Sequence, residues 1–368
     1  MRRISLDEIT SGMKVSRPIY SSEGRILLAA GIELSETYVR RLQELGIASI
    51  FIEDADFAPV ADIPEVISEQ TRQESMRIVR EGFDSLSSNR RINTRAFKKV
   101  VDNLVYELLD NRTILINACD IRAYDDYTFG HSLSVGILAM MTGIKLGYNE
   151  AKLRDLGVGA LLHDIGKTQI DKDIINKPFE LTPEEYAQVK NHTDYGFDIL
   201  RSYEDLSLLS AHVSYQHHER FDGKGYPRGL SKTTIHEYAS IVSAADVFDA
   251  LSADRPYRKA FSVFESADYL RRMSGSAFDA KVVEALTANI AMFPIGSVVR
   301  LNTAEIGIVV NIDPKQAAHP TVRVVFDPTG QRLPAQKLLD LRNTDTYVYE
   351  VLDQNQVVKL FNANPALV

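Results

Sequence analysis

The sequence predicts a mainly α fold: a helical bundle with a small module at each end of the chain. Residues 65–295 repeat apolar side chains at helical spacing, as Val100, Leu104 and Leu108 do. Short strand patterns separated by turn residues occur before residue 55 and again after residue 296. We therefore expect a helical bundle flanked by a small N-terminal α/β module and a small C-terminal β module.

The length supports more than one domain, because 368 residues exceed what a single hydrophobic core usually organises. We expect an α/β module, a candidate regulatory module, at 1–55 and a linker with a helical connector at 56–112. The functional helical domain is expected at 113–295 and the β module at 296–368. The hydrophobic content of 45% and charged content of 25% are those of a globular protein.

Charge and cysteine usage narrow the class of partner and the compartment. A net charge of −8 argues against binding of large nucleic acids, so an anionic substrate would need locally placed cations. The longest apolar runs are too short for a membrane span, and no apolar segment follows the N-terminal arginines. The single cysteine excludes an internal disulfide and favours the reducing cytoplasm.

The terminal modules are predicted element by element. Strand patterns occur at 15–20 and 25–30, and Ser35 is placed to cap a helix that Gly46 would end. The segment 47–52 then reads as a returning strand. After residue 296, strand patterns occur at 297–301, 306–312 and 321–326.

The sequence predicts where one helix of the bundle begins, shortly before a candidate site residue. Thr182, Pro183 and Glu185 supply an N-cap, a first-turn proline and the glutamate of a capping box. A helix therefore begins at this point. We expect His192 to lie within that same helix.

Histidines and aspartates recur at the ends or on the apolar faces of these predicted helices. Any one of them alone would usually be an ordinary core or surface residue. The set is His131, His163, Asp164, His192, His217, His218 and Asp246. Ligands collected from several helices are how carboxylate–histidine metal centres are built in bundles. His and Asp without Cys suit iron, manganese or zinc, and seven ligands suit two ions better than one. We expect the adjacent residues His163 and Asp164 to bridge the two ions.

The segment HHERFDGKGYP, residues 217–227, places two imidazoles at the start of a glycine-rich loop. Its glycines either allow a sharp turn beside a metal or are plain turn residues. Glu219 either orients an imidazole or faces solvent. Asp249, three residues after Asp246, either supports the site or is an ordinary helix-surface acid.

Together the HD doublet at 163–164 and HHERFDGKGYP resemble an HD-GYP domain, a branch of the HD metal-dependent phosphohydrolases. The resemblance runs from about Asp125 to Tyr257 and includes TFGHS, LLHDIGK, KNH and SAADVFDALSADRPYR. It implies an HD-type helical bundle and hydrolysis of cyclic di-GMP to pGpG or GMP. The terminal modules also resemble segments that flank such domains, with no implication for their ligands.

The resemblance assigns roles position by position. The seven histidines and aspartates match metal ligands, with two divalent ions per chain, iron or manganese. Lys167 matches a lysine near the scissile phosphate, where it could stabilise charge or protonate the departing oxygen, and Asp164 joins it in catalysis. Asp125 either pairs with Lys167 or is a surface acid. The positions that match substrate contacts are Lys167, Gly225, Tyr226, Arg255 and Arg258.

Two details qualify this assignment. Some HD-GYP domains carry a glutamate four residues before the first histidine, which completes a third metal site. Tyr127 occupies that position here, so we expect two metals. Alternatives to a cyclic di-GMP phosphodiesterase are a non-catalytic cyclic di-GMP receptor and an HD enzyme acting on another nucleotide. The sequence leaves open a homodimer and signalling partners such as a diguanylate cyclase.

Overall fold

The structure, a computed structural model, describes residues 2–6, 9, 12–20, 26–45, 47, 49–53, 65–116, 127–177, 179–253, 261–353, 356–357 and 359–360. Some predictions fall wholly or partly outside these residues. They include the linker ahead of residue 65, the helix-ending role of Gly46, and the roles of Asp125, Arg255 and Arg258. Tyr127 begins a described helix, but its side chain lies outside the described part.

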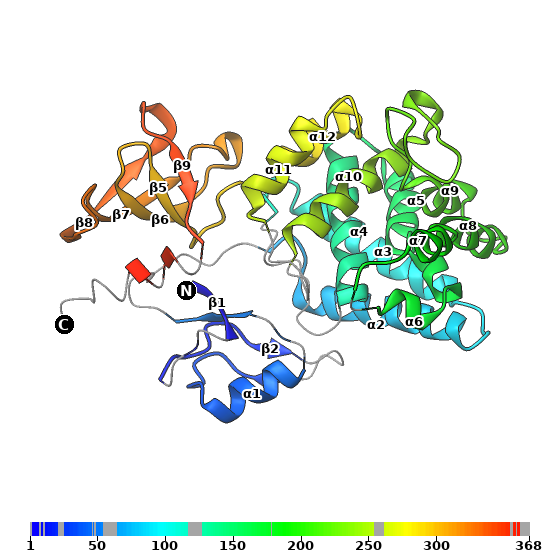
Figure 1. Cartoon of the computed structure of the whole chain (residues 1–368), viewed down its shortest axis with the longest axis horizontal. Helices are drawn as coiled ribbons and strands as arrows, with labels where there is room; N and C mark the ends of the chain where they lie inside the picture. The colour runs from blue at the N-terminus through cyan, green and yellow to red at the C-terminus, as the bar shows by residue number, and fades with distance from the viewer. Residues whose placement is uncertain are drawn as a thin grey trace.

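Helices between residues 69 and 287 form the central bundle (Figure 1). Their bounds are α2 Glu69–Ser87, α3 Thr94–Asp110, α4 Tyr127–Lys145, α5 Glu150–Leu161, α6 Lys172–Ile175, α7 Pro183–Lys190, α8 His192–Arg201, α9 Leu208–Gln216, α10 Glu237–Ser252, α11 Val263–Arg272 and α12 Ala280–Thr287. Short 3₁₀ helices are η3 Ile165–Gln169 and η4 Lys232–Thr234. The prediction of a mainly helical centre is confirmed. Among the described residues, no helix is both long and apolar enough to cross a bilayer.

Helix α4 is the central helix of the bundle. Its side chains are buried along nearly its whole described length, including Leu133, Val135, Ile137 and Met140. It packs against α2, α5, α10 and α12. A helix that is apolar on every face belongs in a protein interior. His131 in its second turn is therefore carried into the bundle rather than to the surface.

The helix that begins after Thr182 is shorter than expected. Thr182 caps it, and the capping box with Glu185 is present, so the predicted start is confirmed. However, α7 ends at Lys190, and α8 begins at His192. The expectation that His192 continues the first helix is wrong. Asn191 ends one helix and begins the next with a helical backbone, and its side chain makes no capping hydrogen bond to α8.

The N-terminal module contains two small antiparallel strand pairs and one helix. Strand β1 (Arg2–Ser5) pairs with β4 (Ser49–Ile52), and β2 (Ile19–Tyr20) pairs with β3 (Ile26–Leu28). Helix α1 spans Glu36–Glu44, and Ser35 accepts a hydrogen bond from the Tyr38 amide, as predicted for a cap. Strand β1 was not predicted. These elements bury their own apolar cluster, which includes Val15, Ile50 and Leu42.

The C-terminal module is a five-stranded antiparallel sheet in the order β8–β7–β6–β5–β9. Its strands are β5 Val298–Leu301, β6 Ile306–Asn311, β7 Thr321–Phe326, β8 Arg332–Asp340 and β9 Val348–Val351, with 3₁₀ helices η5 Pro314–Gln316 and η6 Leu341–Asn343. The first three strands match the prediction, whereas β8 and β9 were missed. Side chains such as Val299, Val309 and Val322 join the apolar cluster of the bundle.

Candidate metal centre

Five segments of the bundle bring the predicted ligands together. His131 comes from α4, and His163 and Asp164 follow the end of α5. The other ligands lie on α8, at the end of α9 and on α10, and they are His192, His217, His218 and Asp246. Helices α4, α5, α8, α9 and α10 contact one another in this part of the bundle. The seven residues separated by up to 115 positions in sequence thus meet in one place.

Two groups of ligand atoms share Asp164. In the first group, atoms of His131, His163 and Asp164 all lie within 4.8 Å of one another. In the second group, the same holds for Asp164 with His192, His217 and His218. A carboxylate common to two clusters is the arrangement expected of a residue that bridges two ions.

Asp246 lies beside the first group. Its Oδ1 atom is 3.1 Å from His131 Nε2, the ring nitrogen that faces the site. It comes from α10, which follows the HD doublet in the chain. The geometry therefore lets Asp246 complete the first group.

Close backbone packing fixes the HD doublet against α8. A Cβ atom on Gly166 would lie 1.9 Å from the carbonyl oxygen of His192 and 2.5 Å from the amide nitrogen of Gly196. No side chain fits there, so glycine allows η3 to approach α8 directly. Ser214 on α9 donates a hydrogen bond of 2.7 Å to the His163 carbonyl oxygen. These contacts set the positions of His163 and His192 relative to each other.

Backbone carbonyl groups orient three of the imidazoles. The Nδ1 atoms lie 2.8 Å from the Ala160 oxygen for His163, 2.7 Å from the Val189 oxygen for His192, and 2.9 Å from the Ser214 oxygen for His217. A carbonyl oxygen only accepts, so each Nδ1 must carry the proton. The Nε2 lone pair of each ring is then free to face the site.

These lone pairs converge on Asp164. Its Oδ1 atom lies 3.5 Å from His192 Nε2 and 3.8 Å from His217 Nε2, and the two nitrogens are 3.3 Å apart. His163 Nε2 and Asp164 Oδ1 are buried and make no hydrogen bond. Buried acceptors that face one another without a donor are costly. A divalent cation among them would remove that cost, so the residues present fit a metal centre.

The ionisation of the second group also suits a metal. Burial lowers the pKa of His192 and His217, and it lowers the pKa of His218 to about 3. The three rings are therefore neutral at pH 7, which is the form that ligates a metal. Burial alone would raise the pKa of the Asp164 carboxyl, but Lys167 and the surrounding histidines hold it well below its usual range.

His131 is held differently from the other rings. Its Nδ1 atom lies 2.7 Å from Asp249 Oδ2, and both side chains are buried. Burial would lower the pKa of His131, but its hydrogen bonds with Asp246 and Asp249 outweigh that and raise the pKa to about 10. Of the two roles left open for Asp249, the structure favours support of the site. It does so by fixing the His131 ring.

Lys167 lies beside the shared carboxylate of the candidate metal centre. Its Nζ atom is 2.5 Å from Asp164 Oδ2, and about a third of its side chain is exposed. The ammonium group therefore reaches from the buried carboxylate toward solvent. Asp125, its predicted partner, lies outside the described residues.

Glu219 has neither of the roles that were predicted for it. Its side chain is only 2% exposed, so it does not face solvent. Its two carboxylate oxygens accept hydrogen bonds from the backbone amides of Arg228 at 2.8 Å and Leu230 at 2.9 Å, not from an imidazole. The sequence could not reveal these contacts, because every residue except proline has a backbone N–H and the residue type therefore does not identify the partner. Glu219 closes the loop that carries Tyr226.

The glycines of that loop are required by two different constraints. Gly223 has a φ of 79°, a conformation that disfavours other residues. At Gly225, a Cβ atom would lie within 2.5 Å of the Arg220 nitrogen and the His218 oxygen. The loop thus folds back tightly over the histidine pair. As a result, the Tyr226 ring centroid lies 4.7 Å from that of His218.

Three histidines outside the predicted set contribute no atom to either metal group. His212 contacts Phe197 and lies 3.3 Å from Gln216 Nε2. His236 caps α10, because its Nδ1 atom accepts a hydrogen bond from the Tyr238 amide. His319 lies in the C-terminal module.

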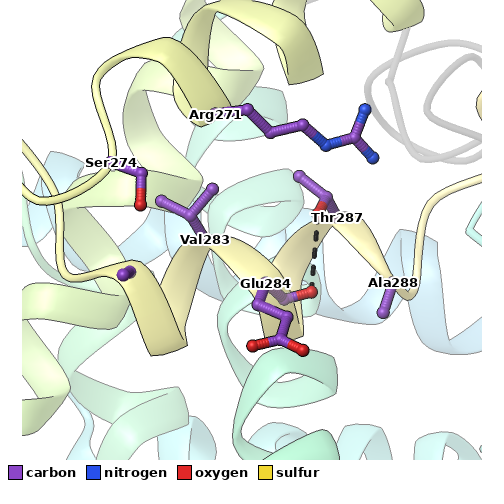
Figure 2. A pocket seen from close by; sticks show the side chains of 7 residues that line it. Arg271, Ser274, Val283, Glu284, Thr287 and Ala288 are labelled. Carbon is purple, nitrogen blue, oxygen red and sulfur yellow. Dashed lines mark hydrogen bonds between the residues drawn. The ribbon is translucent and has the colours of Figure 1, made fainter.

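A separate pocket of about 420 Å³ lies between α11 and α12 (Figure 2). It is lined by Arg271, Ser274, Ala280, Val283, Glu284, Thr287 and Ala288. None of these residues belongs to the predicted site. The metal centre is defined by its buried ligand atoms rather than by this pocket.

Comparison with known proteins identifies relatives of both the helical bundle and the C-terminal module. Residues 104–282 match the model of an HD domain, and residues 298–360 match that of a KOW domain associated with HD domains. The cyclic di-GMP phosphodiesterase PA4108 of Pseudomonas aeruginosa is 32% identical over 252 residues, 68% of this chain and 60% of that protein. A 3'3'-cGAMP-specific phosphodiesterase, number 3 of Vibrio cholerae, is 34% identical over 174 residues, 47% of this chain and 38% of that protein.

A solved structure shares the fold. Bd1817, an HDG"Y"P protein of Bdellovibrio bacteriovorus, aligns with a TM-score of 0.51 at 18% identity and covers 77% of this chain and 97% of that chain. The chain spans less than two thirds of the length of the curated relatives described above.

The fold and the largely buried His/Asp cluster are those of an HD domain whose residues fit a metal centre. The doublet at 163–164 and the loop at 217–227 match the pattern of the HD-GYP branch, which the curated relatives support.

Proposed function

We propose that this chain is a metal-dependent phosphodiesterase that hydrolyses cyclic di-GMP to pGpG, GMP or both. One observation carries the proposal: two groups of largely buried His and Asp ligand atoms share Asp164. The names of the relatives support a cyclic dinucleotide as substrate. Because such a molecule is an intracellular messenger, we propose a cytoplasmic location.

The metal ligands proposed are His131, His163, Asp164, His192, His217, His218 and Asp246. These seven residues would hold two divalent ions, iron or manganese, since oxygen and imidazole donors without thiolate suit these metals. When bound, such ions supply an activated water and neutralise charge on a phosphoryl group. The receptor alternative is disfavoured because the ligand set is complete.

The chain's own residues have separable tasks around such ions. Asp164 belongs to both groups, and the carbonyl groups of α5, α7 and α9 keep each imidazole proton away from the site. Lys167 places an ammonium group beside Asp164, where it can donate a hydrogen bond to a phosphate oxygen or a proton to the leaving oxygen. Tyr226 lies against His218, where its ring can contact the substrate.

The test is hydrolysis by protein prepared anaerobically and loaded with Mn²⁺ or Fe²⁺. We expect cyclic di-GMP to yield a linear product that is resolved by chromatography, and chelation to stop the reaction. A linear product with neither metal would defeat the metal-dependent mechanism, and no product with either metal would defeat the activity. Faster cleavage of 3'3'-cGAMP than of cyclic di-GMP would reassign the substrate, as the Vibrio cholerae relative makes worth testing.

A further inference from the structure

The ammonium group of a lysine lies near two tyrosine rings beside the metal centre. Lys190 is the last residue of α7, and its Nζ atom lies 4.7 Å from the ring centroid of Tyr186, one helical turn earlier. The same atom lies 5.4 Å from the ring centroid of Tyr226 in the loop. We call Tyr186, Lys190 and Tyr226 the Lys190 cluster. The prediction from sequence included only its tyrosine at 226.

No carboxylate of the described residues neutralises the positive charge of this cluster. Within the described part of the chain, no carboxylate oxygen lies within 4.0 Å of Lys190 Nζ, although the side chain is half-buried. Lys167 differs, because it is paired with Asp164. Aromatic faces attract an ammonium group but carry no net charge. The ammonium group of Lys190 is therefore available to bind an anionic ligand.

The cluster is continuous with the second metal group. Tyr226 stacks near His218, whose ligand atom belongs to the group of Asp164, His192 and His217. Tyr186 is 47% exposed, so the cluster opens to solvent while its inner edge meets the metal centre. Burial is the largest cause that raises the pKa of Tyr226, so this phenol is neutral at pH 7.

We propose that the Lys190 cluster is a second anchoring site for the cyclic dinucleotide. Lys190 binds the phosphate that is not being cleaved, and the rings of Tyr186 and Tyr226 pack against the adjoining base. This inference rests on the proposed function and adds a specificity-determining site to it. A cyclic dinucleotide carries two phosphates and two bases, so a substrate held by one phosphate at the metals presents a second anion nearby. An ammonium group recognises such a phosphate as a point charge.

The experiment compares two substrates that differ in what the cluster can contact. Cyclic di-GMP has a second phosphate and bases, whereas bis(p-nitrophenyl) phosphate has one phosphate and no base. We expect Lys190→Gln to raise KM for cyclic di-GMP about tenfold or more, the effect of losing one charge-assisted hydrogen bond. The loss in kcat/KM with bis(p-nitrophenyl) phosphate should be at least about tenfold smaller than the loss with cyclic di-GMP. Lys190→Arg should restore most of the affinity.

Lys152→Gln is the matched control. Lys152 lies on α5, and its Nζ atom is also 4.7 Å from the centroid of a tyrosine ring, that of Tyr148. This variant should keep the wild-type KM. Tyr186→Leu tests the cluster independently and should also raise KM for cyclic di-GMP. Thermal melts and elemental analysis of every variant check that the fold and the metal content are retained.

The outcomes separate this inference from the proposed function. If the wild type hydrolyses cyclic di-GMP and Lys190→Gln has the same KM, the inference is wrong and the proposed function stands. If Lys190→Gln loses metal, the residue acts through the metal centre and the inference is overturned. If the wild type does not hydrolyse cyclic di-GMP, the proposed function fails. Calorimetric binding of cyclic di-GMP then decides: equal affinities overturn the inference, and weaker binding by Lys190→Gln supports it.

Discussion

Glu219→Gln is the substitution that best tests how the loop beside the metal centre is held. The glutamate is buried and accepts backbone hydrogen bonds from Arg228 and Leu230 through both oxygens. Glutamine has nearly the same shape but offers one acceptor and one donor. The NH₂ group would therefore face a backbone N–H of the loop. Two donors would meet where an acceptor is needed.

The magnitude follows from these two contacts. A hydrogen bond to a charged group contributes about 1.5–3 kcal/mol, and a buried donor left without a partner costs about 1–3 kcal/mol. Glutamine weakens one bond and replaces the other with an unpaired donor. We expect the closed loop to lose about 2–4 kcal/mol relative to its open form. This is enough to expose the Tyr226 segment for a substantial fraction of the time.

Hydrogen–deuterium exchange across residues 219–231 is the direct assay. Protection of the Arg228 and Leu230 amides should fall in Glu219→Gln, and KM for cyclic di-GMP should rise because Tyr226 is no longer held in place. Metal content should remain that of the wild type. Asp222→Asn is the matched control, since this exposed residue of the same loop pairs with Arg220 at the surface and should have little effect.

Two results would refute the reasoning. Unchanged exchange at both amides would show that Glu219 does not hold the loop. Loss of metal without any change in loop exchange would show that Glu219 instead orients an imidazole, the role that the structure excludes.

The remaining predictions concern the metal centre and the substrate. The double substitution His163→Ala with Asp164→Ala should abolish turnover and remove metal while far-ultraviolet circular dichroism stays helical; retained activity in a folded variant would remove the dinuclear arrangement. Gly166→Ala should lower the melting temperature and the metal content together, because its Cβ would lie 1.9 Å from the His192 oxygen; a wild-type melt would contradict the close packing. Arg255→Ala should weaken substrate binding far more than metal binding, as calorimetry with each ligand can show; the reverse would make the residue structural. Elemental analysis of protein purified without chelator should give two metals per chain, and three fully occupied sites would refute the expectation drawn from Tyr127.

The ligand set could be predicted from the sequence because metal chemistry restricts the residue types. Few side chains other than His and Asp can serve at such positions, so the motifs TFGHS, LLHDIGK and HHERFDGKGYP carry the ligands in a recognisable order. The structure brings all of them together. It also explains Gly166 of LLHDIGK, which makes room for the His192 backbone rather than forming a turn.

Features that depend on the backbone could not be predicted. Strands β8 and β9 were missed because they lack an alternating pattern with a buried face. Leu338 in β8 and Tyr349 in β9, for example, are exposed. The end of α7 at Lys190 was missed because the segment on both sides of Asn191 retains helical character. Glu219 was misassigned because its partners are amide groups that any residue could supply.

The same reasoning explains why contacts to the substrate are harder to find from sequence than contacts to a metal. A metal accepts few ligand types, whereas a nucleotide can be bound by any suitably placed cation, ring or amide. Lys190 and Tyr226 are 36 positions apart, and only the return of the loop over His218 brings the tyrosine ring to the lysine. That return depends in turn on Gly225, which permits the close approach to His218, and on Glu219, which holds the far end of the loop. The residues that build the HHERFDGKGYP loop therefore determine which side chains can surround a substrate, even where they do not contact it.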